Sequence, residues 1–200
     1  MSKNTLLVLP GLVKERTGLH TNIDDKLIAP EIKAVQDLYV MPLLGSTLFN
    51  KIQNDIATSV NPLIAANLTG AYKILMDEYL IDIICNYTMS ELAPTLNAQY
   101  WNKGVAAKSA DASTPTSGAE LKATADKYRQ RGDNYAQRAK RYLQQNAMTL
   151  FPEYYRHVAG IDIVTPENNV FDSPIWLGGH NADIKPQPSY NLPDRRFDNI

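Results

Sequence analysis

The chain is short of the features that mark several large classes of protein. Its single cysteine, Cys85, excludes an internal disulfide framework, which fits a reducing site of synthesis. With 20 basic and 21 acidic residues the formal net charge is −1, so no overall charge draws the chain to nucleic acid or to membranes. No apolar run approaches the ~20 residues that a bilayer requires, and the patch after Lys3 is too short for a signal segment. We therefore expect synthesis in the cytoplasm.

The middle of the chain carries apolar residues at helical spacing. A first helix should begin at Asp24 or Asp25, either of which can cap free backbone N–H groups. It should end or kink before Gly45, and Ser46 is expected to cap a second helix over 46–57. Because the apolar positions recur every three or four residues, one side of each helix should face a core.

Two longer helical patterns follow. The strongest period covers 69–92, which predicts the central helix of the fold, and Pro94 should close it. A long helix is expected over 118–147, opened by a capping box in which Ser117 is the cap. Gly132 lies inside this second pattern and is expected to be a weak point, because glycine is a poor helix former.

The segment between these helices, 99–118, changes character. An Asn-Lys-Gly turn in it predicts a projecting β-hairpin or loop, and the small polar residues that follow cannot pack by themselves. The hairpin residues that we expect to make contacts are Tyr100, Trp101, Lys103 and Val105. The predicted fold is mainly α: a helical bundle over 24–157 with this insertion, and extended N- and C-terminal arms over 1–23 and 158–200.

The C-terminal arm combines prolines with large apolar residues. Residues 161–200 contain five prolines and several isolated large side chains, which ordinary disordered linkers usually lack. We therefore predict that these side chains anchor the arm on another subunit. The anchors are Phe171, Ile175, Trp176, Leu177, Tyr190, Leu192 and Phe197. Truncation near residue 160 should leave the bundle folded.

Residues that could carry chemistry are sparse and scattered. His20, His157 and His180 lie far apart and have no second ligand at a metal-binding spacing. Cys85 has no basic residue beside it to lower its pKa, so it is expected to be a core thiol. No glycine-rich phosphate loop is present. The sequence therefore predicts a protein that is not an enzyme and needs no metal or cofactor.

The long helix carries a strongly basic set of residues. These are Lys122, Lys127, Arg129, Arg131, Arg138, Lys140 and Arg141. One interpretation is a solvated face whose charges pair along the helix. The other is a face turned toward DNA phosphates or an acidic neighbour, and DNA contact would then be salt-sensitive and limited to the backbone. The candidates for this second role, as subunit-interface or channel charges, are Lys127, Arg131, Arg138 and Arg141.

Three segments in a fixed order resemble a known family. They are APEIKAVQDLYVMPLLGSTLFNKI (29–52), YWNKGVAAKS (100–109), and the Tyr-spaced helix 128–142 running into LFPEYY (150–155). Together they resemble the head–tail connector, or adaptor, subunits of tailed phages, in the form common among phages of Bacteroidetes-type hosts. The resemblance covers roughly residues 25–155 and depends on the order and spacing of all three segments, since each alone fits many helical domains.

The resemblance implies a structural virion protein at the neck of a bacteriophage particle. Such adaptors form a ring, generally of twelve copies, below the portal, where the ring extends the DNA channel and offers a platform to downstream tail or neck proteins. Many subunits insert a C-terminal arm into the portal. The implied partners are thus other copies of the chain, the portal protein and tail proteins, with possible non-specific contact to packaged DNA and none to membrane. A chain truncated near residue 160 should fail to attach to portal complexes.

A closed ring also needs two complementary faces on each subunit. The basic helix of one copy and the acidic residues Asp77, Glu78 and Asp82 of the next would supply such a match. Charge reversal at Arg138 and Arg141 should then weaken rings. The alternatives are a tail-completion or stopper protein of the phage neck, a helical regulator that binds nucleic acid through 122–141, and, last, an enzyme with an unrecognised site.

Overall fold

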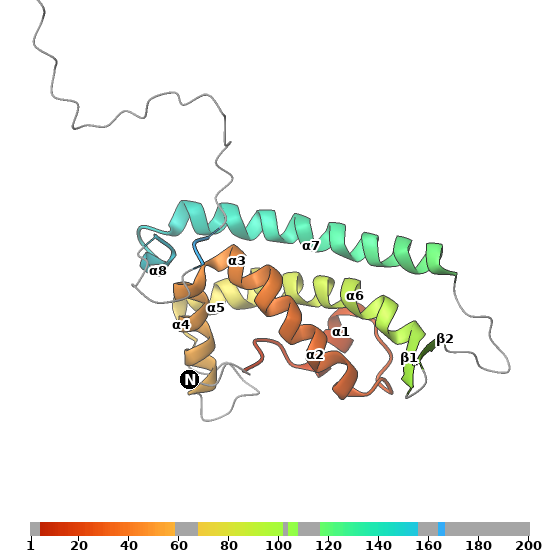
Figure 1. Cartoon of the computed structure of the whole chain (residues 1–200). Coiled ribbons are helices and arrows are strands. Elements are labelled where there is room, and N and C mark those ends of the chain that lie inside the picture. Colours follow the sequence, from red (N-terminus) through yellow and green to blue (C-terminus); the bar gives the residue numbers. More distant parts are fainter. Residues whose placement is uncertain (1–4, 59–67, 102–103, 108–116, 156–163, 167–200) are drawn as a thin grey trace, which may run out of the picture. The chain divides into compact units, whose positions relative to one another are not determined.

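The protein is mainly helical, as the sequence predicts. The computed structural model describes residues 5–58, 68–101, 104–107, 117–155 and 164–166. Its helices, with η1 and η2 as π-helical turns, are α1 (Pro10–Thr17), α2 (Asp25–Val35), η1 (Gln36–Val40), α3 (Met41–Leu44), α4 (Ser46–Ala57), α5 (Gly70–Leu75), η2 (Met76–Leu80), α6 (Ile81–Asn97), α7 (Gly118–Asn146) and α8 (Pro152–Tyr155). They pack around one hydrophobic core (Figure 1).

The helix formed by α5, η2 and α6 is the centre of the bundle. Its apolar face is fully buried at Leu75, Leu80, Ile83 and Ile84, which confirms the prediction of a central helix from its period. The segment α2–η1 runs antiparallel to α6 on one side, and α7 runs antiparallel to it on the other (Figure 1). Each flanking helix thus covers part of the same apolar stripe.

Hydrogen bonds fix the antiparallel register between α2–η1 and α6. The Tyr39 hydroxyl donates to the Glu91 carboxylate (2.7 Å). One turn farther along α6, the Thr95 hydroxyl donates to Glu31 (3.2 Å). The same hydroxyl proton is shared with the Glu91 backbone carbonyl (3.2 Å), one turn back along α6. The prediction that Pro94 closes the helix is therefore wrong, since α6 continues to Asn97.

The ends of the other helices follow their predicted signals with one exception. Asp24 caps α2 by accepting a hydrogen bond from the Lys26 backbone N–H (3.0 Å). Ser117 and Glu120 form the predicted capping box of α7. The bounds of α4 agree with the predicted 46–57, but its cap is Gly45, at φ 76°, and not Ser46. Ser46 is buried and bonds to a segment far along the chain, described below.

The prediction of an extended arm over 1–23 is wrong for its described part. Residues 10–17 form α1, which begins at a proline and ends at Gly18 with φ 73°. Leu7, Val8 and Val13 are buried in the common core. An eight-residue helix is too short to develop the periodic pattern by which helices are recognised in a sequence. The N-terminal segment is therefore a layer of the bundle.

The predicted hairpin is present between α6 and α7. Strand β1 (Ala98–Trp101) pairs antiparallel with β2 (Gly104–Ala107), with Tyr100 opposite Val105 and Trp101 opposite Gly104. The hairpin continues directly from the C-terminal end of α6, and α4 and α8 lie at the other end of the bundle (Figure 1). The stretch 108–116 of the predicted insertion lies outside the described residues.

Gly132, which the sequence predicts to be a weak point of α7, is a contact point with α6. It is buried, and a Cβ built there would lie 2.9 Å from the ring of Tyr87 on α6. That ring has little room to move, because it stacks on Tyr39 with ring centroids 4.3 Å apart and its hydroxyl donates to Asp133 (2.6 Å). Glycine at this position lets α6 and α7 approach closely.

This contact gives a test of the packing. Gly132→Ala should lower the free energy of unfolding by about 1 kcal/mol, because overpacking costs about 1–3 kcal/mol and the gain in helix propensity offsets only about 1. Gly11→Ala in α1 is the matched control, since no atom lies within 4 Å of the added Cβ. It should leave stability equal or higher. Urea denaturation monitored by circular dichroism measures both changes, and a stabilised Gly132 variant would contradict the close-packing interpretation.

Candidate interaction surfaces

The N-terminal segment is held by two glutamine side chains that bind its main chain. Gln36 in η1 is fully buried; its Oε1 accepts from the Leu7 backbone N–H (2.6 Å) and its Nε2 donates to the Thr5 carbonyl (3.2 Å). Gln53 in α4 donates to the same carbonyl (3.0 Å). A side-chain amide can donate and accept at once, so it satisfies backbone groups that lie outside any helix or strand. These bonds fix Thr5 and Leu7 against η1 and α4.

A second segment is bound to α4 in a similar manner. The Ser46 backbone N–H donates to the Val164 carbonyl (2.8 Å), and the Val164 N–H donates to the Ser46 hydroxyl (3.2 Å). Pro166 is buried and packs on Gly45, where an added Cβ would come within 2.8 Å of its ring. We call these contacts the 164–166 latch. They belong to the bundle, so the predicted arm over 158–200 cannot begin at residue 158.

Both bound segments contact the same helix. Ser46 and Gln53 are both buried on α4 and lie about two turns, or roughly 10 Å, apart along it. Thr5 and Pro166 therefore both lie at the α4 end of the bundle. The hairpin lies at the opposite end of the continuous helix α5–η2–α6 (Figure 1), which at 1.5 Å per residue separates the two ends by roughly 40 Å.

Four of the basic residues of α7 form one row. Lys127, Arg131, Arg138 and Arg141 recur at a spacing that places them on a single helix face, and all four are exposed. None of them forms an ion pair with another of the described residues. We call them the α7 row.

Two other members of the basic set do not belong to this row. Lys140 is buried, and Arg129 lies over the ring of Tyr39 in η1, 5.9 Å from its centroid. Both therefore help to pack α7 on the bundle. The helical spacing in the sequence predicts the common face of the row, but it does not show the burial of Lys140 or the contact of Arg129 with Tyr39.

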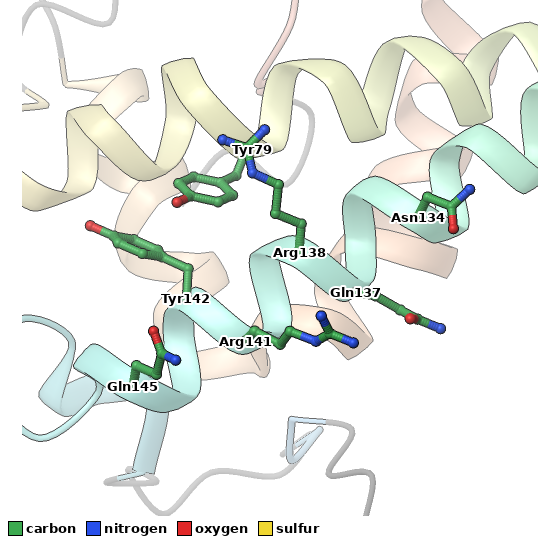
Figure 2. A pocket seen from close by; sticks show the side chains of 7 residues that line it. All are labelled: Tyr79, Asn134, Gln137, Arg138, Arg141, Tyr142 and Gln145. Carbon is green, nitrogen blue, oxygen red and sulfur yellow. The ribbon is translucent and has the colours of Figure 1, made fainter.

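One part of the row lines a hollow against the central helix (Figure 2). The Arg138 guanidinium lies 4.9 Å from the centroid of the Tyr79 ring, and Tyr79 stacks on Tyr142 with centroids 4.5 Å apart. Burial, followed by the neighbouring Tyr79, raises the pKa of Tyr142, so its hydroxyl stays neutral. The hollow measures about 510 Å³ and is lined by Tyr79, Asn134, Gln137, Arg138, Arg141, Tyr142 and Gln145. No carboxylate is among these lining residues.

The acidic residues expected to pair with this row across a ring are partly neutralised within the chain. Asp77 forms an ion pair with Lys73 one turn away (3.0 Å). Asp82 lies 3.9 Å from Arg16 of α1. Glu78 is exposed. The set therefore offers less free negative charge to a neighbour than its sequence suggests.

Several predicted contact residues cannot be placed. The seven arm anchors from Phe171 to Phe197 and Lys103 of the hairpin turn lie outside the described residues. Tyr100, Trp101 and Val105 lie on β1 and β2, but their side chains also lie outside the description. The sequence does not predict the latch at Val164 or the hydrogen bonds of the glutamines to Thr5, because each depends on contacts between distant residues.

The described residues contain no grouping of three or more histidine, cysteine, aspartate or glutamate side chains that could hold a metal ion. Cys85 is buried, as predicted for a core thiol. Burial, with the nearby charge of Asp82, raises its pKa to about 12. The His20 Nδ1 accepts a hydrogen bond from the Asn22 backbone N–H (3.2 Å). Among the helices described, none is both long and apolar enough to cross a bilayer.

These features define a helical bundle with a β-hairpin at one end and two segments bound to α4 at the other. The sequence profile of a family of unknown function, DUF6712, matches residues 40–157, more than half of the 200-residue chain. The chain belongs to this family. The match includes α4 with Gly45 and Ser46, the central helix, the hairpin and α7. No curated protein and no solved structure matches the chain.

The 164–166 latch can be tested by substitution at Gly45. Gly45→Ala adds a Cβ that meets Pro166 and also strains a backbone at φ 76°. The Ser46 amide should lose its protection from hydrogen exchange. The variant should be at least about 1–3 kcal/mol less stable than the wild-type chain, because overpacking against Pro166 and backbone strain act together.

Gly18→Ala is the control for alanine at a positive φ in open space, because Gly18 has φ 73° and no atom near its added Cβ. Its αL backbone (ψ 16°) is strained less by alanine than that of Gly45 (ψ 153°), and the substitution should leave Ser46 protected. Hydrogen-exchange mass spectrometry of peptides covering Ser46 and Val164 measures the difference. Equal protection in both variants would show that Pro166 does not hold the latch closed.

Proposed function

We propose that the chain is a head–tail connector subunit of a tailed-phage particle. It is a structural virion protein that forms a ring of about twelve copies below the portal, extends the DNA channel and joins head to tail. The resemblance over residues 25–155 supports this role. So does the order of elements in the structure, with a helical bundle interrupted by a hairpin between α6 and the long α7.

The observation that carries the proposal is that the hairpin and the two bound terminal segments lie at opposite ends of the bundle. A connector has to bind one neighbour above it and a different one below it. Here the hairpin lies at one end of the bundle, and both terminal segments are fixed to α4 at the other (Figure 1). The 34 residues after Pro166 can span at most about 115 Å, enough to reach a neighbouring protein.

Ring closure requires two different complementary faces on each copy. The two helices that flank α6, α2 and α7, give each copy two different outer faces. The hairpin and the chain beyond Pro166 would then contact the portal and tail proteins. No catalytic group is required for such a role.

Assembly of the full chain is the first test. We expect closed rings of about 270 kDa, which corresponds to about twelve copies of the 22.3 kDa chain. Native mass spectrometry and negative-stain electron microscopy measure copy number and closure. A chain that stays monomeric, alone and with portal rings, would favour the stopper or tail-completion role instead. A monomer or dimer that binds free DNA tightly would favour the regulator.

The C-terminal arm is the second test, and the latch determines where to cut. A chain ending after Pro166 retains the latch, so it should fold and form rings but fail to attach to portal complexes. A chain ending at residue 160 also loses the contacts at Gly45 and should be less stable. Thermal unfolding and co-sedimentation with portal rings measure these outcomes. Loss of folding in the chain that ends after Pro166 would show that residues after 166 belong to the core.

A further inference from the structure

The α7 row is a linear array of positive charge without an acidic counterpart in the described part of the chain. From Lys127 to Arg141 it extends roughly 21 Å along the helix. The residues of α7 that face the core, Gly132, Ala139 and Leu143, lie on the opposite side. Asn134 and Gln145 fall on the same face as the row and are also exposed. The face thus presents cations interspersed with neutral hydrogen-bond donors.

We propose that the α7 row binds the phosphate backbone of duplex DNA. The identity of the DNA as the packaged genome rests on the proposed function, but the binding itself does not require a ring. Amide and guanidinium groups that alternate along a line are the donors that commonly contact phosphate oxygens. The contact is independent of base sequence, because a single helix face of this kind carries charge but no base-reading motif.

The arrangement favours a linear polyanion over an acidic protein face. The charges are spread along the helix, as phosphates are spread along a strand. The hollow next to Arg138 contains no carboxylate, and Asp133 is turned to the other side, where it accepts from Tyr87. The protein face considered as a partner, around Asp77 and Asp82, has cations of its own chain beside it.

Arg138 is held in position for such a contact. Its guanidinium lies over the Tyr79 ring, which in turn stacks on Tyr142 (Figure 2). An arginine that stacks on an aromatic ring keeps its N–H donors free at the edge of the guanidinium plane. Arg138 therefore loses less side-chain freedom on binding phosphate than an unsupported arginine would. Tyr79 is a positioning residue for Arg138.

The test is the salt dependence of DNA binding by the full chain. A labelled 25-base-pair duplex of random sequence is titrated by fluorescence anisotropy between 50 and 200 mM NaCl. Four phosphate contacts per bound copy predict a slope of about −3.6 for log K against log salt, or about 10²-fold weaker binding over this range. The double variant Arg138→Ala/Arg141→Ala removes two contacts, so the slope should fall by about half.

Lys122→Ala is the matched control, because Lys122 is an exposed cation of the same helix but lies off the face of the row. Its slope should equal that of the wild-type chain. Circular dichroism checks that the variants fold, as expected for exposed side chains. A double variant with the wild-type slope, or a control with the same loss as the double variant, would overturn the proposal.

Measurement of ring mass on the same proteins separates this proposal from the proposed function. One outcome is that the double variant binds DNA with the wild-type salt dependence but no longer forms rings. The row then contacts an acidic neighbouring copy, so this proposal is wrong and the connector role stands. If the wild-type chain shows the expected slope and never forms rings, DNA binding by the row stands and the connector role fails.

Discussion

Three helices meet where the ring of Tyr87 packs flat on Tyr39 and against the backbone of Gly132. The two rings stack at 4.3 Å, and their hydroxyls bond in different directions, to Asp133 of α7 and to Glu91 of α6. Burial, followed by the hydrogen bond and charge of Asp133, raises the pKa of Tyr87, so the phenol remains a donor. This contact sets the distance between α6 and α7. It thereby determines that Tyr79 and Arg138, farther along the same pair of helices, lie within reach of each other.

The terminal segments are bound by a different kind of interaction. At both sites, most of the hydrogen bonds recognise the main chain of the bound segment, through Gln36 and Gln53 at Thr5 and through Ser46 at Val164. Such bonds tolerate changes of side chain in the segment that is bound. They depend strictly on the residues that do the binding, and on glycine at position 45. The bundle can therefore keep the same attachment points while the sequences of its ends vary.

Features that depend on neighbouring residues were predictable from the sequence. The period of the central helix, the capping box at Ser117 and the turn of the hairpin each lie within a short window. The N-terminal layer was not, because α1 has only eight residues and its burial depends on contacts with α2 and α6. The end of α6 was not predictable either, because α6 still packs on α2 beyond Pro94, where Thr95 bonds to Glu31.

In the candidate surfaces, too, local features were predictable from the sequence and contacts between distant residues were not. The cations of the α7 row stand in the sequence at helical spacing, so their common face was predictable. The support of Arg138 by Tyr79 and the burial of Lys140 were not, since each requires the packing of α7 on the rest of the bundle. The sequence predicts Ser46 as a helix cap, because serine is among the preferred residues at that position. Its partner, Val164, lies 118 residues away.

The latch also determines how the bundle would respond to mechanical load. Tension applied at Pro166 passes through the 164–166 latch to the corner between α3 and α4. Pro166 bears on Gly45, and the two hydrogen bonds at Ser46 lie beside it. The load therefore passes into buried helices of the core before it reaches α8 or the end of α7. While the latch holds, a pull on the arm leaves the basic face of α7 undisturbed.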